Sequence, residues 1–327
     1  MNQPIKTQKK ERVKYLIISE DQAGQRIDNF LIGCLKSVPK SHIYRILRKG
    51  EVRVNKKRIS PCYHLLPADE LRLPPLFLHH QAKMAPPSKA TATLLAESVL
   101  YEDEHLLIIN KPSGMSVHAG STVRVGIIDV LRHLYPKLPQ LELAHRLDSE
   151  TSGCLILAKK KRILRELHTL LREGKITKIY WTLTKGCWKK SEQRVELPLA
   201  KHYQASGKHV VAVHQEGKAA TTLFHPVKKF KLHPDLIDVS LLEVKLLTGR
   251  THQIRVHAQA KGHPIAGDDR YGDNTFNRLM AQLGLKRLFL HAYSIDFILP
   301  SADKHISVVA PLTPDLATFI KVLEKAV

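Results

Sequence analysis

The chain has 327 residues, which is enough for two domains with at least one sizeable core. Hydrophobic residues make up 43% of it and charged residues 25%, as in an ordinary folded, water-soluble protein. The 52 lysines and arginines outnumber the 30 aspartates and glutamates, so the net charge is +22. Half of that excess, +11, lies in residues 1–90. This imbalance predicts a polyanionic partner, most commonly nucleic acid, although a basic surface can also serve solubility alone.

The sequence also argues against a secreted or membrane protein. The first residues lack an apolar segment of the signal-peptide kind, and no run approaches 18 consecutive apolar residues. The four cysteines, Cys34, Cys62, Cys154 and Cys187, include no Cys-x-x-Cys pair. This spacing fits a reduced cytoplasmic protein better than a disulfide framework or a zinc site.

The first 75 residues predict a basic tail followed by a small compact unit. Residues 1–14 are polar and basic, and we expect them to be disordered unless the partner is bound. Apolar residues at positions 27, 30, 31 and 35 recur at helical spacing. A second helix follows, with Ser41 as its expected N-cap and Gly50 at its end. Residues 52–57 alternate in polarity and predict a short hairpin that turns at Asn55 and Lys56.

Residues 76–94 predict a linker, because proline pairs and a histidine pair stand among alanine, serine and threonine. Beyond the linker, apolar runs predict strands over 99–101, 106–109, 155–158, 180–184 and 239–247, with a helix over 161–173. We therefore expect an α+β chain in which a small α/β unit over 15–75 precedes a strand-rich domain over 95–327.

Basic side chains of the first unit are candidates for phosphate contacts. They lie on the second predicted helix and the hairpin: Lys40, Arg45, Arg48, Lys49, Arg53, Lys56, Lys57 and Arg58. The order Arg26-Ile27-Asp28-x-x-Leu31, then Ser41 to Gly50-Glu51-Val52-x-Val54-Asn55, resembles the S4 RNA-binding domain. That resemblance implies binding to structured RNA by shape and charge. The alternative is an exposed basic helix and hairpin without a partner.

Three motifs of the second part occur in a fixed order. They are Lys111-Pro112-Ser113-Gly114-Met115-Ser116-Val117-His118, then His145-Arg146-Leu147-Asp148-Ser149-Glu150-Thr151-Ser152-Gly153, then Gly249-Arg250-Thr251-His252-Gln253-Ile254-Arg255-Val256-His257. Together they resemble the RluA family of pseudouridine synthases, over roughly residues 95–325. The resemblance implies a long mixed, largely antiparallel sheet flanked by helices, with RNA in a basic central cleft. It also implies isomerisation of uridine without a cofactor.

Finer features are similar to the RluC branch of that family. They are the segments 262–273, 215–218 and 288–292. The RluD branch more typically has a proline after the position of Asp268. The RluC resemblance implies large-subunit (23S) ribosomal RNA as the substrate, with several uridines near the peptidyl-transferase centre.

Asp148, before a tight polar turn, is by itself either a turn residue or a nucleophile. The two other motifs favour the nucleophile. A buried carboxylate needs a nearby cation to stay ionised, and the resemblance makes Arg255 that cation. It also makes Tyr180 the ring that stacks on the flipped uracil and helps to remove the C5 proton. For Tyr180 the alternative is a core aromatic.

Arg146 stands two positions before Asp148, so both side chains share a face if the segment is extended. A base inside folded RNA must be flipped out to react. The resemblance implies that Arg146 fills the vacated space, and a simple phosphate contact is the alternative. His145, beside it in the motif, is grouped with the expected RNA contacts.

The residues after Asp148 are expected to support its loop. Thr151 and Ser152 are expected to make side-chain-to-backbone hydrogen bonds. Gly153 is expected to allow a close approach or an unusual dihedral angle. Cys154 begins an apolar strand, so we expect it to pack in the core.

The histidines His145, His252, His257 and His263 raise the question of a metal. The spacing of five between His252 and His257 does not match the helical His-Glu-x-x-His pair, and no third ligand fits, so we expect no metal. We expect a monomeric cytoplasmic pseudouridine synthase. The alternatives are an RluD-type or transfer-RNA-directed sibling, a non-catalytic RNA-binding assembly factor, and a glycosylase that excises the base.

Overall fold

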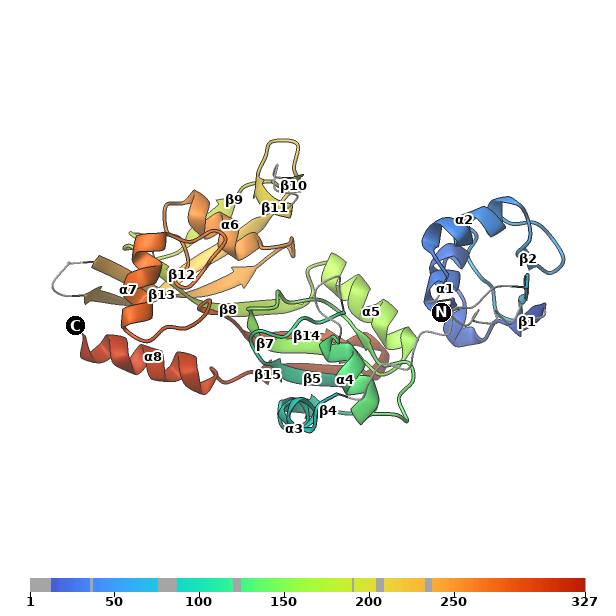
Figure 1. Cartoon of the computed structure of the whole chain (residues 1–327), viewed down its shortest axis with the longest axis horizontal. Helices are drawn as coiled ribbons and strands as arrows, with labels where there is room; N and C mark the ends of the chain where they lie inside the picture. The colour runs from blue at the N-terminus through green and yellow to red at the C-terminus, as the bar shows by residue number, and fades with distance from the viewer. Residues whose placement is uncertain are drawn as a thin grey trace, which may run out of the picture. The chain divides into compact units, whose positions relative to one another are not determined.

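The computed structural model describes residues 13–35, 38–75, 87–119, 125–189, 191–203, 209–232 and 237–326. The chain divides into two compact units at the boundary between Pro86 and Pro87 (Figure 1). Most of the expected tail (1–14) and linker (76–94) lies outside the described residues. The end of the predicted linker is wrong, because Lys89–Glu97 form helix α3. Its N-cap Ser88 accepts the Thr91 N–H, which starts the helix inside the polar segment.

The first unit packs two helices on a three-stranded antiparallel sheet of order β1-β3-β2. Its elements are β1 (Lys14–Ile17), the 3-10 turn η1 (Glu20–Gln22), α1 (Ile27–Cys34), α2 (Lys40–Arg48), β2 (Arg53–Val54) and β3 (Glu70–Leu73). Both expected helices are confirmed, and their apolar stripes form the core of the unit with the inner face of the sheet. The expected cap Ser41 is wrong: the helix already begins at Lys40, and the carbonyl of Pro39 accepts its first hydrogen bonds.

The end of α2 and the turn that follows agree with the prediction. Gly50 has a φ of +67°, the left-handed conformation that commonly ends a helix. Asn55 and Lys56 have φ of 48° and 66°, as in a two-residue turn that joins antiparallel strands. Strand β2, however, pairs along β3 and only bridges back to Lys57, so the hairpin is a single bridge.

The second unit is built on a mixed ten-stranded sheet of main order β4-β5-β7-β14-β8-β13-β12-β9, with β15 beside β14 and β6 beside β7. These strands are β4 (Val99–Glu102), β5 (Leu106–Lys111), β6 (Glu142–Leu143), β7 (Ser152–Ala158), β8 (Thr177–Lys185), β9 (Gln193–Glu196), β12 (Thr221–Leu232), β13 (Ile237–Leu246), β14 (Leu290–Leu299) and β15 (Lys304–Val309). The pairing of β7 with β14 is parallel, and the other pairings within this sheet are antiparallel.

Helices flank this sheet, and a separate hairpin stands beside it (Figure 1). The helices are α3, α4 (Ile127–Leu134), α5 (Lys161–Arg172), α6 (Gln253–Ala260), α7 (Asn274–Gln282) and α8 (Pro314–Lys325), with the short turn η2 (Pro300–Ala302). The hairpin joins β10 (Leu199–Tyr203) to β11 (His209–Val213). The expected mixed, largely antiparallel sheet with flanking helices is therefore confirmed. No helix in the described part of the chain is long and apolar enough to cross a membrane.

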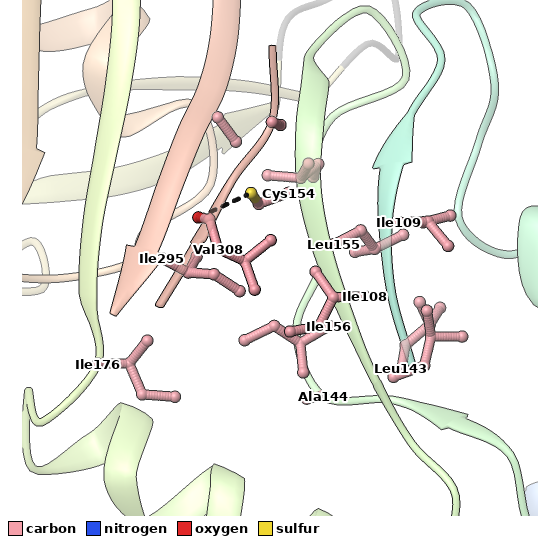
Figure 2. Packing of buried hydrophobic residues seen from close by; sticks show 14 of the residues in the cluster. Ile108, Ile109, Leu143, Ala144, Cys154, Leu155, Ile156, Ile176, Ile295 and Val308 are labelled. Carbon is pink, nitrogen blue, oxygen red and sulfur yellow. Dashed lines mark hydrogen bonds between the residues drawn. The ribbon is translucent and has the colours of Figure 1, made fainter. Parts of the chain in front are cut away.

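The core of the second unit lies around β5 and β7, whose residues are buried almost throughout. Figure 2 shows Ile108, Leu155 and Ile156 in one apolar cluster with Ile295 and Val308 from β14 and β15. Cys154 packs here as expected: burial raises the pKa of its thiol to about 12, so the thiol stays protonated.

Gly153 fixes how closely β7 approaches β14. Its φ is +109°, and a Cβ at this position would lie only 2.2 Å from the Ala292 carbonyl oxygen. A side chain would therefore push apart the two parallel strands at the point where the loop after Asp148 enters the sheet. The expected close approach is confirmed.

Candidate active site

Asp148 lies in the turn that leads into β7. The Thr151 N–H donates to the Asp148 carbonyl at 3.2 Å, which closes the turn. The Lys111 motif at the end of β5 supports it from below: Lys111 Nζ donates to the carbonyl of Ser149, and the Ser113 hydroxyl donates to that of Glu150, at 2.8 and 2.7 Å. Lys111 is fully buried, and burial lowers its pKa to about 7. Hydrogen bonds therefore join the motif that begins at Lys111 to the motif that contains Asp148.

Arg287 holds the same turn from the other side. It donates to the Ser152 hydroxyl at 3.0 Å and to the Glu150 carbonyl at 3.4 Å. Its Nε donates to Asp315, at the start of α8, at 2.6 Å. Ser152 also contacts His291 Nδ1 at 2.8 Å. The expected backbone hydrogen bonds of the Ser152 hydroxyl are therefore wrong, because this hydroxyl meets side chains brought in by β14 and the segment before it.

The expected ion pair between Asp148 and Arg255 is present. Arg255 lies on α6, and its Nη1 donates to Asp148 Oδ2 at 3.3 Å. Its Nε and Nη2 donate to the two oxygens of Asp268 at 2.7 Å each. Asp268 was not predicted as part of the site, and its bidentate pair is shorter than the predicted one.

Asp268 is a permanent anion at the back of the site. Burial alone would raise the pKa of its carboxyl, but hydrogen bonds from Arg255 and from the N–H groups of Arg270 and Tyr271 outweigh burial and hold that pKa below its usual value. The Asp268 side chain has no exposed area. Arg255 is thus oriented by a partner that is out of reach of a substrate.

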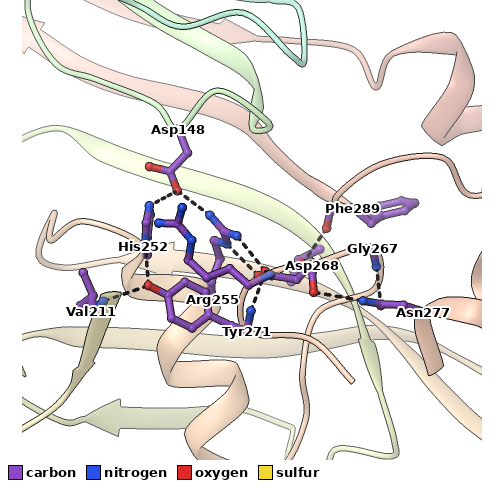
Figure 3. A network of polar contacts seen from close by, with 11 residues as sticks. Asp148, Val211, His252, Arg255, Gly267, Asp268, Tyr271, Asn277 and Phe289 are labelled. Carbon is purple, nitrogen blue, oxygen red and sulfur yellow. Dashed lines mark hydrogen bonds and ion pairs between the residues drawn. The ribbon is translucent and has the colours of Figure 1, made fainter. Parts of the chain in front are cut away.

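His252 and Tyr271 complete the polar network (Figure 3). Tyr271 OH accepts the Val211 N–H and lies 2.7 Å from His252 Nδ1. The hydroxyl proton is then available to Nδ1, which places the histidine proton on Nε2, 3.6 Å from Asp148 Oδ2. Burial lowers the pKa of His252, so the ring is neutral at neutral pH. His252 itself has a φ of 54°, a strained conformation for a residue other than glycine.

A small cavity of about 70 Å³ opens beside Asp148. Arg146, Tyr180, Leu290 and Arg255 are among the residues that line it. A second, larger cavity of about 960 Å³ also contains Arg146, Asp148 and Arg255 in its wall. Three further cationic residues also line this larger cavity: Arg270, Lys286 and Arg287. The geometry suits one planar ring in the small cavity and a phosphate backbone along the large one.

The predicted residues Arg146 and Tyr180 both reach the small cavity. Arg146 is exposed and lines the cavity together with Asp148. Tyr180 comes from β8 and is buried, with 7% of its surface exposed. Burial, with the nearby Asp148 charge, raises the pKa of its hydroxyl, so Tyr180 enters any reaction protonated.

The expected RNA contact of His145 stays a prediction, and the structure shows what one of its ring nitrogens binds. Its Nε2 accepts the Ile156 N–H from β7 at 3.1 Å, so this nitrogen serves the sheet and not an RNA ligand. Burial lowers its pKa to about 4, which keeps the ring neutral. His257 and His263 likewise contact backbone carbonyls, those of Leu197 and Lys185.

The eight basic residues predicted for the first unit are all exposed on it: Lys40, Arg45, Arg48, Lys49, Arg53, Lys56, Lys57 and Arg58. Sequence reasoning missed the roles of Asp268, Tyr271, His252 and Arg287. Asp268 and Tyr271 fall in the segment 262–273 that the sequence singled out. That segment alone does not show which of its aspartates faces Arg255.

A carboxylate paired with an arginine, beside a small cavity that a tyrosine lines and a larger one that cations line, fits the class of enzymes that act on a base of a nucleic-acid strand. The family model described as RNA pseudouridylate synthase matches residues 105–260. The chain belongs to this family.

Individual relatives agree with this assignment. The chain is 47% identical to ribosomal large subunit pseudouridine synthase C of Pasteurella multocida, over 96% of this chain and 95% of the relative. It is also 47% identical to the protein of that name from Escherichia coli K12, over 96% and 98%. Among solved structures, human RNA pseudouridylate synthase domain containing 1 superposes with a TM-score of 0.57 at 26% identity, covering 72% of this chain and 90% of that one.

Proposed function

We propose that this chain isomerises specific uridines of large-subunit (23S) ribosomal RNA to pseudouridine. The observation that carries the proposal is the Asp148–Arg255 pair at a cavity that Tyr180 also lines. The substrate class is supported by relatives named ribosomal large subunit pseudouridine synthase C, which match the chain over nearly their whole length.

The reaction breaks the N1–C1′ bond of uridine and forms a C5–C1′ bond. The proton on C5 leaves, N1 ends with a proton, and nothing is oxidised or reduced, so the chemistry needs no redox cofactor. Asp148 is the nucleophile that divides this change into two easier steps. Attack on the ribose carbon and attack on the uracil ring both fit a carboxylate at this place. The positive charge of Arg255 faces the Asp148 carboxylate as the base enters and displaces water.

Tyr180 and Arg146 handle the extruded uridine. The Tyr180 ring offers a face on which uracil stacks. Its hydroxyl is protonated. It can therefore accept the C5 proton only if it gives its own proton to another group beforehand or in the same step. Arg146 fills the space that the base leaves and contacts a phosphate or a base edge with its planar guanidinium.

The first unit, over residues 15–75, is proposed to act as an S4-like RNA-binding domain. The support is its fold of two helices on a small sheet and the exposure of its eight predicted basic residues. We also propose that the enzyme acts as a cytoplasmic monomer. Light scattering of the purified chain checks the monomer, and a dimer mass at micromolar concentration would contradict it.

The substitution Asp148→Asn tests the proposed function. The asparagine has nearly the same shape but is not a nucleophile, so the variant should bind protein-free large-subunit RNA normally and form no pseudouridine. Asp303→Asn is the matched control, because Asp303 is exposed and has a left-handed φ that asparagine accepts. Appreciable turnover by Asp148→Asn would refute the nucleophile. Release of free uracil by the unsubstituted chain would identify a glycosylase instead, and RNA binding without any reaction an assembly factor.

A further inference from the structure

The outer face of the small sheet in the first unit carries an unusual set of side chains. Strands alternate their side chains between two faces, and here the inward set, Val54, Leu71 and Leu73, is buried in the core of the unit. The outward set on β1 is apolar but exposed: Tyr15 at 59% and Ile17 at 64%. An exposed aromatic ring on an open strand has no role in the core and is available to a ligand.

Tyr15 lies at the edge of a groove of about 790 Å³. Four cations line this groove: Lys49, Arg53, Lys56 and Arg72. Two carboxylates, Glu51 and Glu70, line it as well, so the wall carries a net positive charge. Pairing across the strands places Tyr15 opposite Arg72, and Arg72 opposite Arg53. The three side chains therefore leave the sheet from one cross-strand row.

The arginines of this region are held in place by backbone carbonyls of the turn after α2. Arg58 donates to the carbonyl of Lys49, Arg53 to that of Gly50, and Arg72 to that of Glu51, at 2.7, 3.3 and 2.9 Å. A guanidinium has five N–H donors, and these bonds use one or two of them. The groups are thus oriented before any ligand arrives, and they keep donors for an anion.

Tyr15 and Arg72 were not among the basic residues predicted from the helix and hairpin. A duplex offers phosphates but no exposed base faces, whereas a single strand offers both. The groove combines a ring that stacks with cations that pair with phosphates.

We propose that this groove binds a single-stranded RNA segment, with one unpaired base stacked on Tyr15 and the flanking phosphates on Arg53, Arg72 and Lys56. The proposal rests on the proposed RNA-modifying function and adds to it a second, sequence-tolerant contact in the first unit. An acidic peptide would use the same cations but would gain little from the exposed ring.

The test measures the binding of a six-nucleotide oligoadenylate to the full chain by fluorescence anisotropy at low salt. Adenine stacks well and cannot be isomerised. Loss of a base–aromatic stack weakens binding by roughly five- to a hundredfold, so we expect Tyr15→Ala to raise Kd at least fivefold and Tyr15→Phe to leave it within twofold. Ile17→Ala is the matched control: the residue is as exposed and lies on the same strand and face, but it does not line the groove.

A second measurement locates the contact. An oligoadenylate with one 5-iodouridine is irradiated on the full chain, and the cross-linked peptide is identified by mass spectrometry. A cross-link at Tyr15, competed by single-stranded but not by duplex RNA, supports the proposal. Equal weakening by Tyr15→Ala and Ile17→Ala, equal competition by duplex, or a cross-link only in the second unit would overturn it. Isomerisation of ribosomal RNA by the unsubstituted chain is measured in parallel, so failure of the groove and failure of the proposed function are told apart.

Discussion

Replacing Asp268 by asparagine removes one negative charge from the most buried part of the site. Asp268 accepts two 2.7 Å hydrogen bonds from Arg255, and its side chain has no exposed area. In the variant, the amide can accept one of these bonds, but its NH₂ group faces a guanidinium N–H. Arg255 would then keep a single anionic partner, Asp148, at 3.3 Å.

The expected cost follows from that geometry. Breaking a buried ion pair by removing one partner destabilises a protein by about 3–5 kcal/mol. The lower end applies here because Asp148 still offsets part of the arginine charge. For a unit as large as residues 87–327, each kcal/mol lowers Tm by about 2–4 °C, so we expect a decrease of roughly 6–12 °C.

The dependence on pH is a second, independent part of this prediction. The folded-state pKa of Asp268 is lower than its unfolded value, so the ionised carboxylate stabilises the fold above the unfolded pKa. That contribution is lost as the pH falls through the folded value. The difference in Tm between the two proteins should therefore be constant from pH 5 to 7 and shrink below about pH 4.

Calorimetry of the full chain and its variant at several pH values measures both quantities. Asp269→Asn is the matched control, because the neighbouring Asp269 is exposed and the substitution changes the net charge equally. A decrease in Tm of less than about 2 °C at pH 7, or an equal decrease for Asp269→Asn, would refute the view that Asp268 anchors Arg255.

Other substitutions test how the Asp148 turn is held and used. Arg287→Met removes the contacts to Glu150 and Ser152. Because small misplacements of a reacting group slow catalysis strongly, kcat should fall roughly ten- to hundredfold with KM little changed. A change confined to KM would contradict a positioning role for Arg287. Lys111→Met removes a lysine whose pKa, about 7, lies below its unfolded value, so the unsubstituted protein should gain more stability than the variant as the pH rises from 7 to 10. Parallel stability curves for the two proteins would show that Lys111 stays charged. Tyr180→Phe keeps the ring but not the hydroxyl, and single-turnover rates should fall by about 10²–10⁴ while RNA binding is unchanged; an undiminished rate would limit Tyr180 to stacking.

Much of the central sheet was predictable because β5 and β7 are buried on both faces. Such strands appear in a sequence as continuous apolar runs, as at 106–109 and 155–158. The hairpin β10–β11, strand β14 and helices α7 and α8 were not predicted. Their apolar residues bury against partners far away in sequence, such as the cluster that joins Phe289 to Phe319, so their local pattern is weak.

The site was predictable only where a motif had already fixed a role. Asp148 and Arg255 are 107 residues apart, and no local pattern pairs them. Asp268 stands 13 residues after Arg255, and its position depends on how the chain returns from α6. The hydrogen bond of His145 was not predictable for the same reason, because its partner Ile156 follows only after the turn has closed.

Arg255 is shared unequally between Asp268 and Asp148, which bears on the nucleophile proposed for Asp148. Asp268 takes two short bonds and sets the plane of the guanidinium, which leaves Nη1 for Asp148. The Arg255 and His252 contacts of Asp148 both involve Oδ2 (Figure 3). If Asp148 is the proposed nucleophile, we therefore expect Oδ1 to attack while Oδ2 keeps its contacts to Arg255 and His252. A second short bidentate pair would have held the charge more firmly but would also have occupied the attacking oxygen. The arrangement pairs Asp148 with an arginine that another carboxylate has already oriented.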